Sequence, residues 1–319
     1  MKRNEIIKYL IFASVGVLII YFIQKDFTFD DFITNIKLAK LHFVLASTLV
    51  GVLAVFIRAL RWQLLLKPLG YETKLSNAYH STMSGYLVNL GIPRSGEFSR
   101  CAMLAKTDNV PVQVLVGTVL SERVLDLLML LLVIFASVWA QFDLLYGYVY
   151  DNVIVKLKDN SLGIVLIAVV LLAGLIVAFK AKKIFSPETK IGKVFLGFFD
   201  GIKSVFKLKQ PVLFIVYTIG IWLCYWMMTY FILIAFDFTE HLGLAGGLST
   251  LVFSSLGVII PAPAGSATVY SVYIGLNQIY NISILQAKAA GIVMFFANII
   301  MIIFAGTISY VIMAKRTKV

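Results

Sequence analysis

The feature that most constrains this chain is its series of long apolar runs, such as those within residues 41–66 and 285–313. A helix needs about 20 apolar residues to cross the hydrocarbon of a bilayer, and several of the runs reach that length. Strands of outer-membrane barrels alternate apolar and polar residues, which these continuous runs do not. We therefore predict an all-α polytopic membrane protein.

The composition agrees with this class. Apolar residues make up 60% of the chain and charged residues 14%, whereas a soluble domain carries about 25% charged residues. The net charge of +12 comes from Lys and Arg beside apolar segments, where the positive-inside bias and anionic lipids explain it. No zinc-finger spacing or RNA-binding signature is present, so we expect no nucleic-acid partner. The two cysteines and three histidines form no metal-ligand pattern, and we expect no cofactor.

The flanking charges orient the predicted helices. Lys2, Arg3 and Lys8 surround the start of an apolar helix at 6–23 that no small-residue cleavage site follows. We predict an uncleaved helix with a cytoplasmic N-terminus. Five further crossings are expected at about 41–66, 111–140, 162–179, 212–236 and 285–313. The basic end of the last one predicts a cytoplasmic C-terminus and a location in the cytoplasmic (inner) membrane.

Two apolar segments are too short to cross. Residues 77–92 would reach about 24 Å at 1.5 Å per residue, and the return at 96–105 is shorter still. Lys74 and Lys106 flank this pair, so we predict a re-entrant hairpin entered from the cytoplasm. A second hairpin at 244–279 would enter from outside. The tips carry Asn89, Gly91, Pro93 and Gly96 in the first hairpin, and Pro261, Pro263 and Gly265 in the second.

The order of elements repeats. Helix, helix, hairpin and long helix occur at about 6–140 and again at 162–313, within one predicted domain of residues 1–319. Three crossings in each half would invert the second half relative to the first. Inverted repeats with broken helices are typical of transporters. Pro and Gly at the tips leave backbone groups that hydrocarbon does not tolerate, so the tips must be buried in protein or line a wet cavity.

Two segments have one apolar face. Residues 26–40 fit a short helix in the outer interface, or a loop. Residues 190–209 place lysines around an apolar stripe, which is typical of a basic amphipathic helix on an anionic leaflet; packing against the protein's own helices is the alternative.

Charged residues deep in apolar sequence mark a site in a membrane protein. Glu122 and Asp126 share one face of a long helix, and Arg123 is turned away by about 100°. We predict that Arg94 and Arg100 pair with the two carboxylates of this face, and that Glu97 pairs with Arg123. Arginine can grip a phosphate through two hydrogen bonds, which suits an anionic headgroup. The predicted site is Arg94, Glu97, Arg100, Glu122, Arg123, Asp126, Arg58 and Arg61.

Other interpretations of these charges stay open. The ion pairs can be purely structural. If the long helix begins near Val124, the charges belong to a cytoplasmic loop instead. Arg58 and Arg61 can also extend to the cytoplasmic interface without joining a site.

The residues that carry these charges resemble a known family. The stretches Arg58-Ala59-Leu60-Arg61-Trp62, Asn89-Leu90-Gly91-Ile92-Pro93 with Gly96-Glu97, and Ser121-Glu122-Arg123-Val124-Leu125-Asp126 are similar to the transmembrane, flippase-like domain of lysylphosphatidylglycerol synthases and its stand-alone relatives. Two positions of the second half depart from the family pattern. Tyr270, after the second tip, stands near a usual acidic position, and Phe295-Phe296 in the last helix stand where an arginine is frequent. We expect a substrate different from that of the best-known members.

The resemblance implies a lipid flippase that moves a polar-headed phospholipid, anionic or aminoacylated, between leaflets. We expect no enzyme activity, because no aminoacyl-transfer or nucleotide-binding domain is recognisable. An ion-coupled carrier of a small anion is one alternative. A membrane subunit that holds a lipid- or glycan-modifying enzyme is another. Homo-oligomers and such an enzyme are the possible protein partners.

Overall fold

The computed structural model describes residues 29–92, 94–150, 208–259 and 266–317, which are helical throughout with short connections and contain no strand. The helices are α2 (Phe29–Ile36), α3 (Leu41–Leu66), a 3₁₀ turn (Lys67–Leu69), α4 (Leu75–Gly91), α5 (Gly96–Asp108), α6 (Val112–Ala140), α7 (Phe142–Val149), α11 (Pro211–Ile234), α12 (Asp237–Glu240), α13 (Gly243–Ile259), α14 (Ala267–Tyr280) and α15 (Ile284–Arg316).

Four helices are long and apolar enough to cross a membrane: α3 with its 3₁₀ turn, α6, α11 and α15. They match four of the six predicted crossings to within a few residues. The other two, at 6–23 and 162–179, lie outside the described residues, as does the predicted amphipathic segment up to residue 207. α2 confirms a short helix, not a loop, within 26–40.

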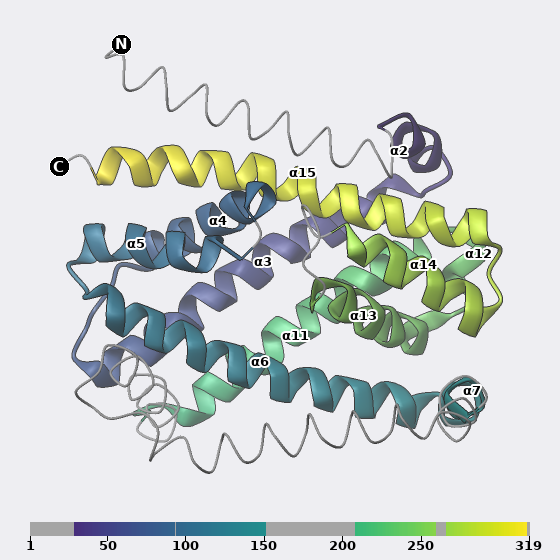
Figure 1. Ribbon diagram of the computed structural model, residues 1–319, viewed down its shortest axis with the longest axis horizontal. Helices are drawn as coiled ribbons and strands as arrows, with labels where there is room; N and C mark the ends of the chain where they lie inside the picture. Colours follow the sequence, from purple (N-terminus) through teal and green to yellow (C-terminus); the bar gives the residue numbers. More distant parts are fainter. Residues whose placement is uncertain (1–28, 93, 151–207, 260–265, 318–319) are drawn as a thin grey trace, which may run out of the picture.

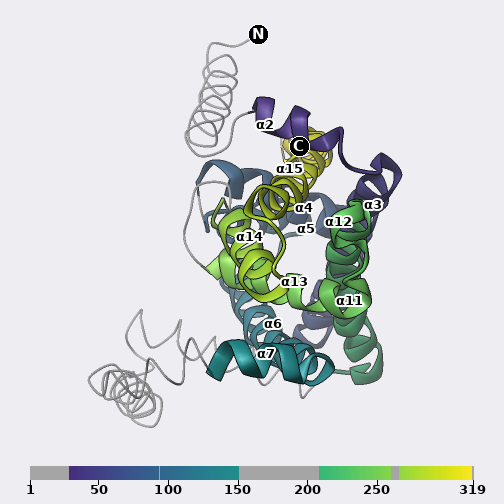
Figure 2. The same cartoon turned by 90° about the vertical axis from the view of Figure 1, so that its right-hand side faces the viewer.

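The long helices form antiparallel pairs. α6 and α15 run in opposite directions along two edges of the molecule, and α3 and α11 cross between them, also in opposite directions (Figure 1). α3 and α11 pack directly against each other, and Figure 2 shows both on the same side of the molecule. Ion pairs link Lys40, the residue before α3, to Asp237 and Glu240 of α12, which follows α11 (2.9 and 2.5 Å).

Both predicted hairpins form. α4–α5 enters from one end of the molecule and α13–α14 from the opposite end, with their tips directed toward the middle (Figure 1). The guanidinium of Arg94 at the first tip donates to the carbonyl of Ile259 at the end of α13, at 3.1 Å. The two hairpins therefore touch at their tips, at an exposed contact that gives the polar tip of the first hairpin a protein partner.

Glycine allows each hairpin to close. The backbones of Gly85 in α4 and Gly96 in α5 approach so closely that a Cβ on Gly96 would overlap the Gly85 carbonyl. The N–H of Gly96 donates to the Asn89 side chain at 2.6 Å, which satisfies a donor at the start of α5. In the second hairpin a Cβ on Gly257 would lie 2.6 Å from the Cα of Thr268.

The long helices differ in burial. α15 lies largely within the protein, and Ala287, Ala289 and Ala290 are almost fully buried in its first turns. α6 is mostly exposed, and Leu128, Leu131 and Leu132 leave more than half of their surface open. Apolar side chains exposed along a membrane-length helix are expected to face lipid. Thr118, Ser121, Glu122 and Ser137 of α6 are instead buried within the protein.

Candidate functional site

Seven charged side chains from three helices meet beside the first hairpin, and we refer to them as the ion cluster. The set is Arg58 and Arg61 from α3, Glu97 and Arg100 from α5, and Glu122, Arg123 and Asp126 from α6. Each helix contributes on the face that packs against the other two. The cluster joins residues up to 68 positions apart in the chain.

Glu122 is the fully buried centre of the ion cluster. Its carboxylate accepts from Nη2 of Arg100 at 2.5 Å and lies 3.4 Å from Nη2 of Arg61. The same Arg61 nitrogen donates to Asp126 at 3.0 Å. Arg61 and Glu122 are both 0% exposed. A buried charge is costly without a partner, so each of these two charges depends on the oppositely charged groups of the ion cluster.

Arg58 connects the ion cluster to two further helices, α4 and α11. It pairs with Asp126, and its Nη1 donates to the hydroxyls of Tyr86 in α4 (2.7 Å) and Tyr225 in α11 (3.3 Å). Sequence reasoning missed both tyrosines. Tyrosine in a membrane helix is ordinarily expected at the interface, and nothing in the local sequence marks these two as partners of a buried arginine.

Arg123 forms the accessible edge of the ion cluster. Its guanidinium contacts Glu97 at 3.2 Å and Asp126 at 3.1 Å. The side chains of Arg123 and Glu97 are 42% and 37% exposed, whereas Glu122 is fully buried. Arg123 and Glu97 are therefore the most accessible members of the ion cluster.

Trp62 positions the arginine of α5. Its indole N–H donates to Thr118 of α6 at 2.9 Å, and the guanidinium of Arg100 lies 4.7 Å from the centre of its ring. A cation over a tryptophan face is attracted by the electrons of the ring. Trp62 thus holds α3, α5 and α6 in register around Glu122.

The ion cluster carries a net positive charge. Four guanidinium groups and three carboxylates leave one net positive charge. Several buried N–H groups, namely Nε of Arg58, Arg61 and Arg100 and Nη1 of Arg61, have no hydrogen-bond partner within the described chain. A buried donor without an acceptor costs about 1–3 kcal/mol, and more when it is charged. Added oxygen acceptors would lower that cost.

The structure brings together most of the predicted residues. The predicted pairs Arg100–Glu122 and Glu97–Arg123 both form. The prediction that Arg94 pairs with the carboxylates is wrong. Arg94 has a left-handed backbone (φ 66°) at the tip, which turns its side chain toward Ile259 of the other hairpin.

Two alternatives for these charges are also wrong. Arg58 and Arg61 do not extend to the interface, because both side chains form ion pairs with Asp126 of α6. The charges do not form a cytoplasmic loop, because α6 begins at Val112 and carries Glu122 inside a continuous helix.

Among the predicted tip residues, Asn89 and Gly96 bond each other and Gly91 ends α4. The others, Pro93, Pro261, Pro263 and Gly265, lie outside the described residues.

The hydroxyls that hold Arg58 allow a first test. Tyr86→Phe should destabilise the protein by about 1.5–3 kcal/mol, the usual value of a hydrogen bond to a charged group. Tyr225→Phe should have a smaller effect because its bond is longer. The double variant should exceed the sum of the two, since it alone leaves Nη1 of Arg58 without either hydroxyl. Equilibrium unfolding in detergent would measure all three; equal effects for the single variants would contradict this geometry.

Fold and site together define a polytopic helical membrane protein in which two opposed hairpins lie beside buried ion pairs. The chain belongs to the family described as the lysylphosphatidylglycerol synthase TM region, whose sequence model matches residues 6–306.

Two curated relatives come from Methanocaldococcus jannaschii. The UPF0104 membrane protein MJ1595 is 27% identical over 129 residues, 40% of this chain and 38% of the relative. The UPF0104 membrane protein MJ1078 is 26% identical over 230 residues, 72% of this chain and 95% of the relative. The match thus covers less than half of the first relative and nearly all of the second. No solved structure matches the chain significantly.

Proposed function

We propose that this protein is a transporter that moves a polar-headed lipid, anionic or aminoacylated, between the leaflets of the cytoplasmic membrane. The observation that carries the proposal is the ion cluster: net positive, rich in buried N–H donors without partners, and accessible at Arg123. Two of its three helices, α3 and α6, are otherwise apolar enough to span a bilayer, and the third, α5, belongs to the first hairpin.

The ion cluster would lower the barrier to headgroup movement. A charged group at the bilayer centre costs several kcal/mol or more. A lipid phosphate at Arg123 would replace Glu97 as its partner, since both are partly exposed, and guanidinium can hold a phosphate through two bonds. The released Glu97 and the adjacent Asp126 would then receive the ammonium of an aminoacylated headgroup.

Two opposed halves offer a route for alternating access. α3 packs on α4 as α11 packs on α13, and α4 packs on α15 as α13 packs on α6. The corresponding helices, α3 with α11 and α6 with α15, run in opposite directions (Figure 1). We infer that the halves form an inverted repeat, as in many transporters. The hydrogen bond from Arg94 to Ile259 would break and re-form as the tips move.

Charges at the two ends support one orientation. Lys74, Lys106 and Arg316 lie at the open end of the α4–α5 hairpin, and Asp143 and Asp237 lie at the opposite end (Figure 1). The positive-inside bias would place the first end, with the end of α15, in the cytoplasm.

The function can be tested by leaflet exchange in vesicles. Fluorescent phosphatidylglycerol and phosphatidylcholine would be followed in proteoliposomes and in protein-free vesicles. We expect exchange of phosphatidylglycerol at least tenfold faster than without protein, with a smaller effect on phosphatidylcholine. Uptake of labelled inorganic phosphate without lipid exchange would favour a small-anion carrier. Neither activity would indicate a membrane subunit of another enzyme.

A further inference from the structure

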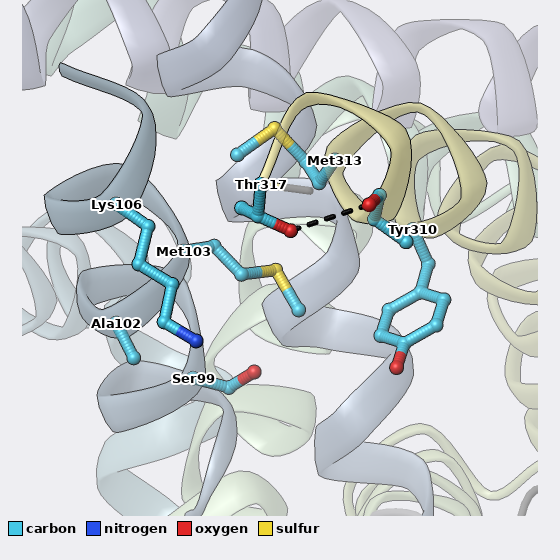
Figure 3. Close-up of a pocket in the computed structure, with 8 residues that line it drawn as sticks. Ser99, Ala102, Met103, Lys106, Tyr310, Met313 and Thr317 are labelled. Atoms are coloured by element: carbon cyan, nitrogen blue, oxygen red, sulfur yellow. Dashed lines mark hydrogen bonds between the residues drawn. The ribbon is translucent and has the colours of Figure 1, made fainter. Parts of the chain in front are cut away.

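A pocket outside the ion cluster lies between the two helices that carry basic residues at the same end of the molecule. It has a volume of about 370 Å³, within the range of small-ligand sites. One side is lined by four residues of α5: Ser99, Ala102, Met103 and Lys106. The other side is lined by Tyr310, Met313 and Ala314 of α15 and by Thr317, which directly follows that helix (Figure 3). The pocket uses a different face of α5 from the ion cluster: it takes Ser99, whereas the ion cluster takes Arg100.

Small side chains leave the space open. Ser99 and Ala102 on α5 face Ala314 across the pocket, and none of the three is large enough to fill it. Met103 and Met313 form its apolar walls (Figure 3). Methionine is flexible and polarizable, so walls of this kind adapt to a chain of variable shape.

The polar groups of the pocket suit an anion. Lys106 is exposed and forms no ion pair within the described part of the chain. The Ser99 hydroxyl donates to no group among the described residues. Lys315 and Arg316 follow closely on α15 and add positive charge at the same end. The pocket thus combines apolar walls with a cation at the basic end of α5 and α15. This combination matches a phospholipid whose acyl chain enters the pocket and whose phosphate contacts the Lys106 amine.

We propose that this pocket binds one anionic phospholipid of the cytoplasmic leaflet, with the phosphate at Lys106 and the start of an acyl chain between Met103 and Met313. The rest of the lipid would remain in the bilayer beside α5 and α15. The site does not depend on transport, because it shares no side chain with the ion cluster. It would supply a lipid directly beside the hairpin that carries Arg100 and Glu97.

Native mass spectrometry of the purified full chain tests the proposal. The protein in detergent would be titrated with phosphatidylglycerol, phosphatidylcholine or glycerol 3-phosphate. We expect one phosphatidylglycerol bound in preference to phosphatidylcholine. Lys106→Gln should weaken it about fivefold, the factor that one Lys contributes near an anionic surface. Ala102→Trp should abolish it by filling the pocket.

Matched variants keep the result specific. Lys67→Gln removes a cation at the same end of the molecule but outside the pocket, and Val112→Trp adds the same bulk at an exposed position of α6. Both should bind as the wild type does, and so should Arg123→Gln even if transport fails. Unchanged binding in Lys106→Gln or Ala102→Trp would overturn the proposal. So would equal binding of the two lipids, or competition by glycerol 3-phosphate as strong as that by the intact lipid.

Discussion

Replacing Glu122 with glutamine is expected to destabilise the protein by about 3–5 kcal/mol, the usual effect of removing one partner from a buried ion pair. The side chain keeps its size, so the loss comes from charge alone. Arg100 would lose its 2.5 Å partner, and Arg61 would keep only Asp126. Neither guanidinium can reach water, because both lie on faces packed between α3, α5 and α6.

A matched substitution at the accessible edge should behave differently. Glu97→Gln removes the same charge from the same cluster, but Glu97 is 37% exposed and its partner 42%. Solvent-exposed pairs contribute about 0–1 kcal/mol. Equilibrium unfolding of both variants in detergent would measure the difference. If Glu122→Gln were as stable as Glu97→Gln, the buried position of Glu122 would be contradicted.

Replacing Gly96 with alanine should be as damaging, for a steric reason. The added methyl group would overlap the Gly85 carbonyl and come within 2.7 Å of the Asn89 side chain. Overpacking a tight contact costs about 1–3 kcal/mol, and more where the obstacle is backbone that cannot rotate away. The bond from Gly96 N–H to Asn89 would also be lost as α4 and α5 separate. We expect loss of most folded protein, measured as the monodisperse fraction on size exclusion.

Two other glycines serve as controls for this prediction. Gly147 in α7 has no atom within 4 Å of the position that a Cβ would take, so Gly147→Ala should not destabilise the protein and should stabilise α7 by up to about 1 kcal/mol. Gly257→Ala in the second hairpin should resemble Gly96→Ala, since its Cβ would meet the backbone of Thr268 and Ala267. Normal yield of Gly96→Ala would show that the hairpin is not closed on this glycine.

The extent of the helices could be predicted because a bilayer imposes a length. α3 occupies residues 41–66 as predicted, and α6 begins within one residue of its expected start. The first hairpin could be predicted because its segments of 17 and 13 residues, flanked by lysines, are too short to cross. The second hairpin followed from the basic end of the last helix, which fixes where that helix must start. Both signals are local in sequence.

The partners within the site depend on how the helices pack, which no local pattern records. The spacing of Glu122 and Asp126 predicted a shared face of α6, but not that Arg58 and Arg61 of α3 would meet it. Tyr86 and Tyr225 reach Arg58 from helices far apart in the chain. Arg94 was assigned the wrong partner because its left-handed backbone, which sets its direction, cannot be read from sequence.

The pocket was not predicted for a similar reason. It forms where small residues of α5 and α15 face each other, more than 200 positions apart. The small residues of either helix, taken alone, are ordinary for a membrane protein. The pocket forms only where α5 of the first hairpin approaches α15.

The most direct test of the account is headgroup-selective leaflet exchange by Arg123→Gln, compared with Lys67→Gln and wild type at equal reconstituted amounts. Arg123 is partly exposed, so its loss should leave the fold intact while removing the first contact with a phosphate. We expect exchange of phosphatidylglycerol to fall to the protein-free rate in Arg123→Gln and to stay at the wild-type rate in Lys67→Gln. Wild-type exchange by a folded Arg123→Gln protein would contradict the claim that the ion cluster conducts the headgroup.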